Sequence, residues 1–379
     1  MSLLNYLLSS NLKSRFSKFY FDSENPLESQ NNTLMNLLSK AKNTLYGKKY
    51  SFKDITTIEK FASRIPPLTY EEFFPIISKM VQGETNISWP GKIKWFAKSS
   101  GTTNDKSKFI PVSYEALSFN HFKAGKDLLS IYLNNHPDSK IFTGKSLSIG
   151  GSRQISPLDN NIFTGDISAV LIKNLPIWAR FFRTPSMKVA LMSEWENKIQ
   201  KMAMITSKQN VTSISGVPTW TIVLIKRILK LNKCENILEL WPNLELFIHG
   251  AVSFKPYKEL FDSLVPSNQL NYLETYNASE GFFAFQDKKN SDEMLLLLNH
   301  GIYYEFEDIA NKNKILSLDK VEINKNYALI ISTNSGLWRY KIGDTIVFSS
   351  LNPYRIRISG RTKQFINAFG EELIVENAE

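Results

Sequence analysis

The chain has 379 residues, of which 42% are hydrophobic and 12% aromatic, and its 46 Lys and Arg against 36 Asp and Glu give a formal charge of +10. The apolar surface of 25 Phe, 15 Tyr and 7 Trp excludes disorder over most of the chain. Basic residues are scattered singly or in pairs such as Lys48-Lys49, with no run of five or more. This pattern favours a solvated surface over a nucleic-acid face.

The cysteine content and the lengths of the apolar runs bear on where in the cell the protein is expected. Cys234 is the only cysteine, so no internal disulfide forms, which fits a reducing environment. No apolar run approaches the roughly 18 residues that span a bilayer. The N-terminal leucines precede the first lysine, the reverse of a signal peptide. We therefore expect a cytoplasmic protein without membrane contact.

Residues 1–92 are helical in pattern. Leu34, Leu37 and Leu38 recur at helical spacing, and residues 54–61 carry a helix start signal. Thr69, followed by Glu71 and Glu72, predicts a capped helix after the Pro66-Pro67 break.

From residue 93 onward the pattern predicts an α/β sheet that passes into a β-rich part. Two strand-loop-helix units, which begin at residues 211 and 244, indicate the α/β sheet. The remaining expected strands span residues 93–96, 109–112, 270–275, 294–299, 327–333, 344–348 and 355–359, and a long helix is expected over 113–133.

The segment Ser99 to Lys108 is the strongest local signal for phosphate binding. Hydroxyl side chains, Gly101 and two lysines supply small donors and compensating cations for a triphosphate. The Walker pattern does not fit, because no glycine precedes Lys106 and a strand follows the loop. The alternative is a solvated hairpin loop.

Two shorter glycine motifs resemble this loop less closely. Gly144-Lys145-Ser146 and Gly150-Gly151-Ser152 lack a spaced upstream glycine, which favours tight turns over anion cradles.

Two later loops also place polar groups beside strands. Thr275 to Gly281 follows a strand and holds the carboxylate of Glu280, which suits Mg²⁺; a surface turn is the alternative. Asp344, after a glycine at the start of a strand, could accept hydrogen bonds from ribose hydroxyls. The alternative there is a β-turn with Arg339 and Lys341 pointing outward.

Other catalytic patterns are absent from the sequence. His121, His136, His249 and His300 have no metal-ligand spacing with one another or with the cysteine. No Gly-x-Ser-x-Gly motif is present, which argues against an α/β-hydrolase.

Taken in order, the motifs resemble those of the auxin-responsive acyl-acid amido synthetase (Gretchen Hagen three) family, within the adenylate-forming superfamily of luciferases and acyl-CoA synthetases. The resemblance runs from about Trp95 to the end of the chain. Its motifs are Ser99 to Thr102, Gly216 to Trp220, His249 to Phe254, Tyr276 to Glu280, Arg339 to Asp344, Ser359 to Lys363 and Phe369 to Leu373.

The resemblance implies an α/β fold with a large N-terminal domain of sheets flanked by helices and a β-rich subdomain. It implies an ATP- and Mg²⁺-dependent ligase that converts a small-molecule carboxylic acid to acyl-AMP and transfers the acyl group to an amino acid. Separately, the scattered basic residues lead us to expect no nucleic-acid partner. An acyl-CoA ligase that shares the first half-reaction and a non-catalytic nucleotide-binding protein that lacks its lid remain alternatives.

The resemblance also implies roles for individual residues. Catalytic roles fall to Glu280, Lys106 and Thr103, with Glu280 as the metal ligand. The acid would contact Phe122, Lys126, Val217 and Trp220. Nucleotide binding is implied for Ser99, Ser100, Gly101, Thr102, Thr103, Gly250, Ala251, Val252, Thr275, Tyr276, Asn277, Ala278, Ser279, Asp344 and Arg361.

The expected organisation has three parts. Residues 1–92 form a helical segment of the large domain, and residues 93–363 form the adenylate-forming core, with the β subdomain from about 270 to 363. Residues 364–379 form the hinge and first hairpin of a C-terminal lid domain. Lid domains of the family have roughly 100 residues, and only residues 364–379 follow the hinge here. We therefore expect most of the lid domain to be missing from this chain.

Overall fold

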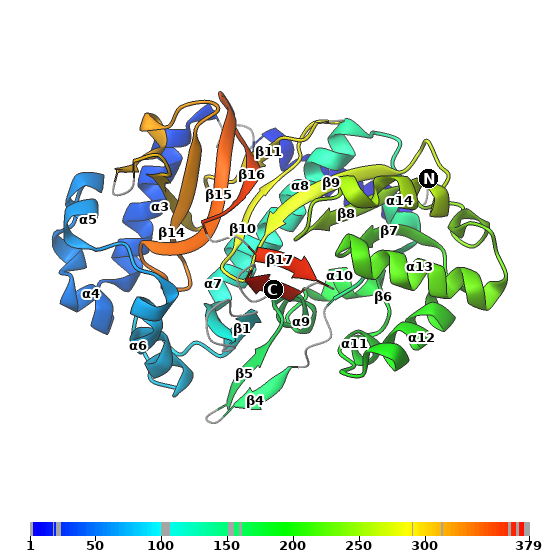
Figure 1. Ribbon diagram of the computed structural model, residues 1–379, viewed down its shortest axis with the longest axis horizontal. Coiled ribbons are helices and arrows are strands. Elements are labelled where there is room, and N and C mark those ends of the chain that lie inside the picture. Colours follow the sequence, from blue (N-terminus) through cyan, green and yellow to red (C-terminus); the bar gives the residue numbers. More distant parts are fainter. Residues whose placement is uncertain are drawn as a thin grey trace.

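Helices form the beginning of the chain, as the leucine spacing predicts (Figure 1). The computed structural model describes residues 3–17, 19, 24–99, 107–150, 155–158, 161–289, 291–311, 314–362, 365–368 and 371–374. The first helices are α1 (Leu3–Lys13), α3 (Pro26–Ala41), α4 (Leu45–Lys49), α5 (Ile58–Arg64) and α6 (Tyr70–Val81).

Two of these helices follow the sequence signals residue by residue. Leu34, Leu37 and Leu38 all lie on the buried face of α3. Thr69 caps α6 through a capping box, in which the Thr69 backbone N–H donates to Glu72 Oε2 at 2.7 Å. This reciprocal bonding satisfies two helix-terminal donors and fixes where α6 begins.

The centre of the molecule is one mixed sheet of twelve strands. Its order is β13-β12-β14-β15-β16-β11-β10-β9-β8-β7-β3-β6. The strands at one end are parallel, namely β3 (Lys145–Ser148), β6 (Arg183–Thr184), β7 (Val211–Ser215), β8 (Leu246–Gly250) and β9 (Asn271–Asn277).

The remaining strands of this sheet pair antiparallel with one another. They are β10 (Phe282–Phe285), β11 (Met294–Leu296), β12 (Ile302–Asp308), β13 (Ile315–Leu316), β14 (Asn326–Thr333), β15 (Tyr340–Leu351) and β16 (Tyr354–Arg361). The expected β-rich part therefore continues the α/β sheet, and β9 joins the two halves by pairing parallel with β8 and antiparallel with β10.

Helices cover the parallel half of the sheet (Figure 1). Burial of their apolar faces against β7 and β8 builds a separate core cluster, which includes Ile225, Trp241 and Phe247. The helices of the middle region are α7 (Tyr114–Ala116), α8 (Phe122–Asn135), α9 (Ile167–Lys173), α10 (Ile177–Phe182), α11 (Met187–Ala190), α12 (Trp195–Thr206), α13 (Pro218–Asn232) and α14 (Lys258–Leu264). A π-helical turn, Leu117–His121, joins α7 to α8 within the long helix expected over 113–133.

Two smaller sheets complete the described fold. One has the order β2-β1-β5-β4, with β1 (Trp95–Ser99), β2 (Lys108–Val112), β4 (Ser156–Leu158) and β5 (Ile162–Gly165). The other is the antiparallel pair β17 (Phe365–Ala368) and β18 (Glu371–Ile374), at the position of the expected hairpin. None of the helices in the described ranges has the length and apolar character needed to cross a membrane.

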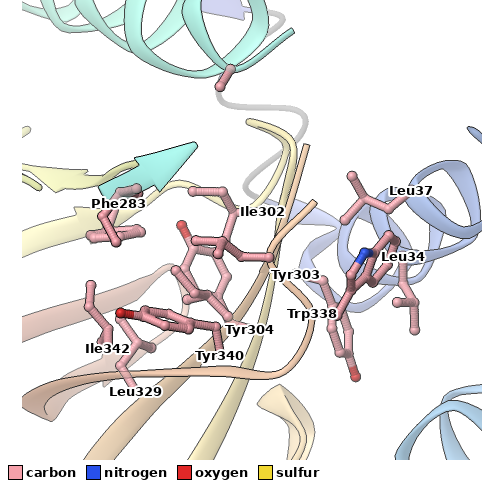
Figure 2. Close-up of a cluster of buried hydrophobic side chains, with 14 of the residues drawn as sticks. Leu34, Leu37, Phe283, Ile302, Tyr303, Tyr304, Leu329, Trp338, Tyr340 and Ile342 are labelled. Carbon is pink, nitrogen blue, oxygen red and sulfur yellow. The ribbon is translucent and has the colours of Figure 1, made fainter. Parts of the chain in front are cut away.

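Aromatic side chains fill the core between the antiparallel strands and the N-terminal helices (Figure 2). Trp338 lies beside Leu34 and Leu37 of α3, and its Nε1 donates to Ser88 O at 3.1 Å. Tyr303 and Tyr304 are adjacent in β12, and both are buried. This strand is therefore covered on both faces, which removes the apolar-polar alternation of a half-exposed strand.

The structure contradicts the alternative in which Arg339 points outward from a β-turn. Arg339 does not point outward, because its guanidinium is buried and forms an ion pair with Glu305 at 2.9 Å. The same group donates to the carbonyl oxygens of Ala62 and Ile65 at 2.7 and 2.6 Å, which ties the end of α5 to the sheet. Lys341 is partly exposed and pairs with Glu307 at 2.8 Å.

Candidate active site

A cleft of about 920 Å³ opens at the carboxyl ends of the parallel strands β3, β7, β8 and β9. Carboxyl ends of parallel strands meet at one edge of an α/β sheet, where ligands bind. The described residues that line it include Lys98, Ser99, Ser148, Gly150, Asp166, Arg183, Ser215, Gly216, Val217, Trp220, His249, Gly250, Ala251, Thr275, Asn277 and Ser279.

The rim of the cleft between β8 and β9 is tightly constrained. A Cβ on Gly250 would lie 2.4 Å from Thr275 O, so only glycine permits this approach of the two strands. Thr275 Oγ1 donates to His249 O at 3.0 Å, and Ala251 adopts a left-handed conformation with φ of +70°. These features give the predicted nucleotide-binding residues Gly250, Ala251 and Thr275 a fixed geometry.

His249 precedes Gly250 in β8, and its side chain packs against Phe254. Its ring stacks on Phe254 with centroids 4.4 Å apart, and the side chain is almost fully buried. Burial lowers the pKa of His249 to about 4, so the imidazole is neutral at physiological pH. The neutral ring therefore does not act as an anion-binding cation.

A compact turn between β9 and β10 carries the predicted metal ligand. The backbone N–H of Ala278 donates to Gly281 O at 2.9 Å, which closes the turn around Ser279 and Glu280. Asn120, from the π-helical turn, accepts from the Phe282 backbone N–H at 2.7 Å and fixes the first residue of β10. The turn thus holds Ser279 at the cleft wall.

Three residues predicted to bind nucleotide, Tyr276, Asp344 and Arg361, are linked by a hydrogen bond and an ion pair beside this turn. Tyr276 Oη donates to Asp344 Oδ2 at 2.6 Å, and Arg361 Nε lies 2.8 Å from Asp344 Oδ1. Burial and the Asp344 charge raise the pKa of Tyr276 well above its usual value, so this hydroxyl remains a donor. The structure thereby brings together residues that are widely separated in sequence.

Glu280 has an altered acidity in this setting. Burial, followed by the negative charge of Asp344, raises its pKa to about 7, and this rise outweighs the opposing charges of Lys108 and Arg361. A positive charge placed nearby would lower this pKa and favour the ionised form of Glu280.

The predicted phosphate loop is described only at its ends. Ser99 lines the cleft at the end of β1, next to Lys98, a cation that sequence reasoning did not select. Lys108 Nζ lies 5.4 Å from the centroid of the Tyr70 ring. The predicted residues Ser100, Gly101, Thr102, Thr103 and Lys106 fall outside the described residues.

The predicted acid-binding residues separate into two groups. Val217 and Trp220 line the cleft, whereas Phe122 and Lys126 are not among the described residues that line it. Helix α8 instead packs its apolar face against β10 and β11, with Leu128 and Ile131 in a cluster with Phe285. Nor does Val252 line the cleft, although its neighbour Ala251 does.

Apolar residues from α9 and the start of α12 line the wall that α8 does not provide. The sequence contains a short apolar stretch at residues 167–173, which is typical of a buried helix. Only the tertiary structure shows that this helix, α9, lies at the cleft. The apolar residues of this wall are Ile167, Leu171, Ile172, Leu175 and Trp195.

The first of the shorter glycine motifs does not form the expected tight turn, because Gly144 has an extended backbone and Lys145 and Ser146 begin strand β3. A Cβ on Gly144 would lie 2.4 Å from Asn210 O, and Lys145 Nζ donates to Phe181 O at 2.7 Å. Gly150 lines the cleft, while residues 151–154 lie outside the described part of the chain.

The fold is that of adenylate-forming enzymes. It resembles a 2-hydroxyisobutyryl-CoA ligase with a TM-score of 0.59 at 14% identity, covering 92% of this chain and 71% of the ligase. The likeness to the GH3.15 acyl acid amido synthetase is stronger, with a TM-score of 0.79 at 17% identity over 96% of this chain and 74% of that protein.

The chain belongs to the GH3 family. The model of the GH3 family N-terminal domain matches residues 15–270, and that of the GH3 family central domain matches residues 295–361. A curated relative, indole-3-acetic acid-amido synthetase GH3.2 of Arabidopsis thaliana, is 22% identical over 398 residues, which cover 86% of this chain and 71% of the relative. The chain spans 64% and 63% of the Arabidopsis relatives GH3.3 and GH3.1.

Proposed function

We propose that the protein activates a carboxylic acid with ATP and transfers the acyl group to the amine of an amino acid. The observation that carries this proposal is that one cleft joins two kinds of surface. Polar and backbone groups near Ser99, Gly250 and Thr275 suit a nucleotide, and the apolar wall beside Val217 and Trp220 suits an organic acid. The relatives named as amido synthetases support the choice of an amine as the acceptor.

The proposed chemistry has two balanced steps. A carboxylate oxygen of the acid attacks the α-phosphorus of ATP, and pyrophosphate leaves. The amine nitrogen then attacks the acyl carbonyl, loses a proton, and AMP leaves. Both steps depend mainly on positioning and on neutralisation of charge, which the fixed rim between β8 and β9 supports.

We assign the nucleotide contacts as follows. Thr275 and Tyr276 hold the adenylate, and Asp344 with Arg361 binds the ribose. The two carboxylate oxygens of Asp344 contact Tyr276 and Arg361, and a carboxylate retains further lone pairs for a ribose hydroxyl. Ser99, Ser100, Thr102 and Thr103 would hold phosphates, with Lys106 as a compensating cation.

The residues present fit Mg²⁺ held jointly with phosphate oxygens. Among the described residues there is no cluster of three or more His, Cys, Asp or Glu that could enclose a metal. Mg²⁺ is commonly bound by one or two carboxylates together with substrate phosphates, and Glu280 supplies one such carboxylate. The bound ion would neutralise charge on the phosphates during adenylation.

Exchange of labelled pyrophosphate into ATP, measured with a panel of carboxylic acids, tests the first step. We expect acid-dependent exchange that falls at least tenfold in Glu280→Gln and is unchanged in the exposed control Glu259→Gln. Product analysis with amino acids and with CoA identifies the acceptor: an acyl thioester would indicate the acyl-CoA ligase. ATP binding with no exchange for any acid would indicate a non-catalytic binding protein and refute the proposal.

The proposed setting is the cytoplasm, with small-molecule acids and amino acids as partners. The single cysteine supports a reducing compartment. The expectation that no nucleic acid is bound stays a prediction, which a filter-binding measurement with RNA and DNA at physiological salt can test.

A further inference from the structure

An arginine lies at the end of the cleft that is remote from the rim between β8 and β9. Arg183, in β6, lines the cleft and pairs with Ser146 of the neighbouring strand β3. Strand β6 lies four positions from β9 in the sheet order β9-β8-β7-β3-β6. At about 4.8 Å per strand, the backbones of β6 and β9 are separated by roughly 19 Å.

Most of the hydrogen-bonding capacity of this guanidinium is unused. Arg183 Nη1 donates to Pro185 O at 2.6 Å, but Nε and Nη2 are buried and have no hydrogen-bond partner. Burial lowers the pKa of Arg183 to about 10, so the group still carries its charge at neutral pH. Leaving charged donors buried and unpaired is costly, and an acceptor in the cleft would remove this cost.

A second cation lies near Arg183. Lys198 in α12 is fully buried, and its Nζ donates to Gly150 O at 3.0 Å. Burial lowers the pKa of Lys198 to about 8, the charge of Arg183 adds to this effect, and the charge of Asp166 opposes it. Asp166 is the one acidic side chain among the described residues that line the cleft. Lys198 does not itself line the cleft, but its charge adds to the positive field at the end that Arg183 occupies.

From this arrangement we infer that Arg183 binds a second carboxylate, at the end of the acid substrate opposite the carboxylate that is adenylated. The inference rests on the proposed function and specifies its substrate class: an acid with an apolar spacer and a distal carboxylate. The apolar residues Leu171, Ile172 and Trp195 line the cleft and suit the spacer. A planar guanidinium with two unused donors matches the geometry of a carboxylate.

The amino acid substrate does not account for Arg183 equally well. The carboxylate of an α-amino acid lies within two bonds of its amine, and the amine must reach the acyl carbonyl beside the nucleotide rim. Arg183 belongs to the strand at the opposite end of the cleft, four strand positions away. A distal group on the acid itself can occupy that end while the other carboxylate reacts.

Calorimetric titration of the full chain with octanedioate and octanoate tests the inference, because the two acids have the same chain length and differ in the distal carboxylate. We expect octanedioate to bind at least tenfold more tightly to the wild type. Arg183→Met should abolish this preference and leave octanoate affinity within twofold, whereas the surface control Arg227→Met should retain the preference. Equal affinities in the wild type, a preference that survives Arg183→Met, or no binding of either acid would overturn the inference.

Thermal unfolding separates ligand binding from a structural role. Removal of an unpaired buried charge should leave the melting temperature of Arg183→Met equal to or above that of the wild type. Arg183→Lys keeps the charge without the planar fork, so it should retain only part of the preference; full retention would contradict the geometric argument. Pyrophosphate exchange distinguishes the two proposals: octanedioate binding through Arg183 without exchange for any acid would refute the proposed function alone.

Discussion

Tyr276 and Asp344 are joined by a hydrogen bond of 2.6 Å from Oη to Oδ2, although they lie in strands β9 and β15, 68 residues apart. Arg361 contacts the other oxygen of the same carboxylate. The orientation of the Asp344 carboxylate is therefore set from two sides.

Tyr276→Phe should weaken ATP binding and lower stability. The variant loses a buried hydrogen bond to a carboxylate, a loss of about 1.5–3 kcal/mol in the free energy of unfolding. We expect the Kd for ATP to rise about tenfold because Asp344 is then held by Arg361 alone. Calorimetry and urea unfolding measure the two effects. Tyr114→Phe, at a position 74% exposed, is the control and should change neither.

Ionisation of Glu280 should make folding stability depend on pH. Its pKa is about 7 in the folded protein, above the ordinary carboxyl value, so the folded state binds the proton more tightly. The resulting stabilisation is complete at acidic pH and is lost as the pH rises through about 7. Wild type should lose more stability than Glu280→Gln between pH 5 and pH 8 in urea titrations. Parallel curves for the two proteins would contradict the assignment.

Gly250→Ala should damage the rim of the cleft between β8 and β9. The new Cβ would lie 2.4 Å from Thr275 O, so β8 and β9 would have to separate. We expect a loss of about 1–3 kcal/mol in unfolding free energy, together with weaker ATP binding. Gly125→Ala is a matched control in α8, where a Cβ has no neighbour within 4 Å. That control should stabilise the helix by up to about 1 kcal/mol.

Arg339→Met should be strongly destabilising, since it leaves Glu305 buried without its cation and removes the donor for the carbonyls of Ala62 and Ile65. Loss of one partner of a buried ion pair costs about 3–5 kcal/mol. The double variant Arg339→Met/Glu305→Gln should recover part of that loss in guanidinium unfolding. The exposed control Lys325→Met should stay within about 0.5 kcal/mol of the wild type. An additive double variant would show that the two charges are not coupled.

The sequence predicts those parts of the fold that repeat locally. The leucines of α3, the capping box of α6 and the strand-helix units at β7 and β8 all carry short-range signals, and all are present. Strands β10 and β12 were missed because residues such as Tyr303 and Tyr304 are adjacent and both buried, so the strand lacks an alternating pattern.

The sequence placed Thr275 at the end of an expected strand, whereas Gly250 and Ala251 were expected only through the family resemblance; that these residues bind nucleotide stays a prediction. Gly250, Ala251 and Thr275 meet at the cleft because parallel strands end at one edge of the sheet. The apolar wall from α9 and the buried end with Arg183 depend on which helix packs over which strand. Residue spacing along one chain does not contain that information, and Phe122 and Lys126 were therefore chosen instead.

The shared strand β9 has a mechanical consequence. Hydrogen bonds join every neighbouring pair of strands from β6 to β13, so the rim between β8 and β9 and the aromatic core around Trp338 belong to one continuous sheet, with a register shift where β9 meets β10. Bending this sheet at β9 would break several ladder bonds at once. We therefore expect opening and closing of the cleft to come from elements outside the sheet, with slow amide exchange in β9 whether or not nucleotide is bound.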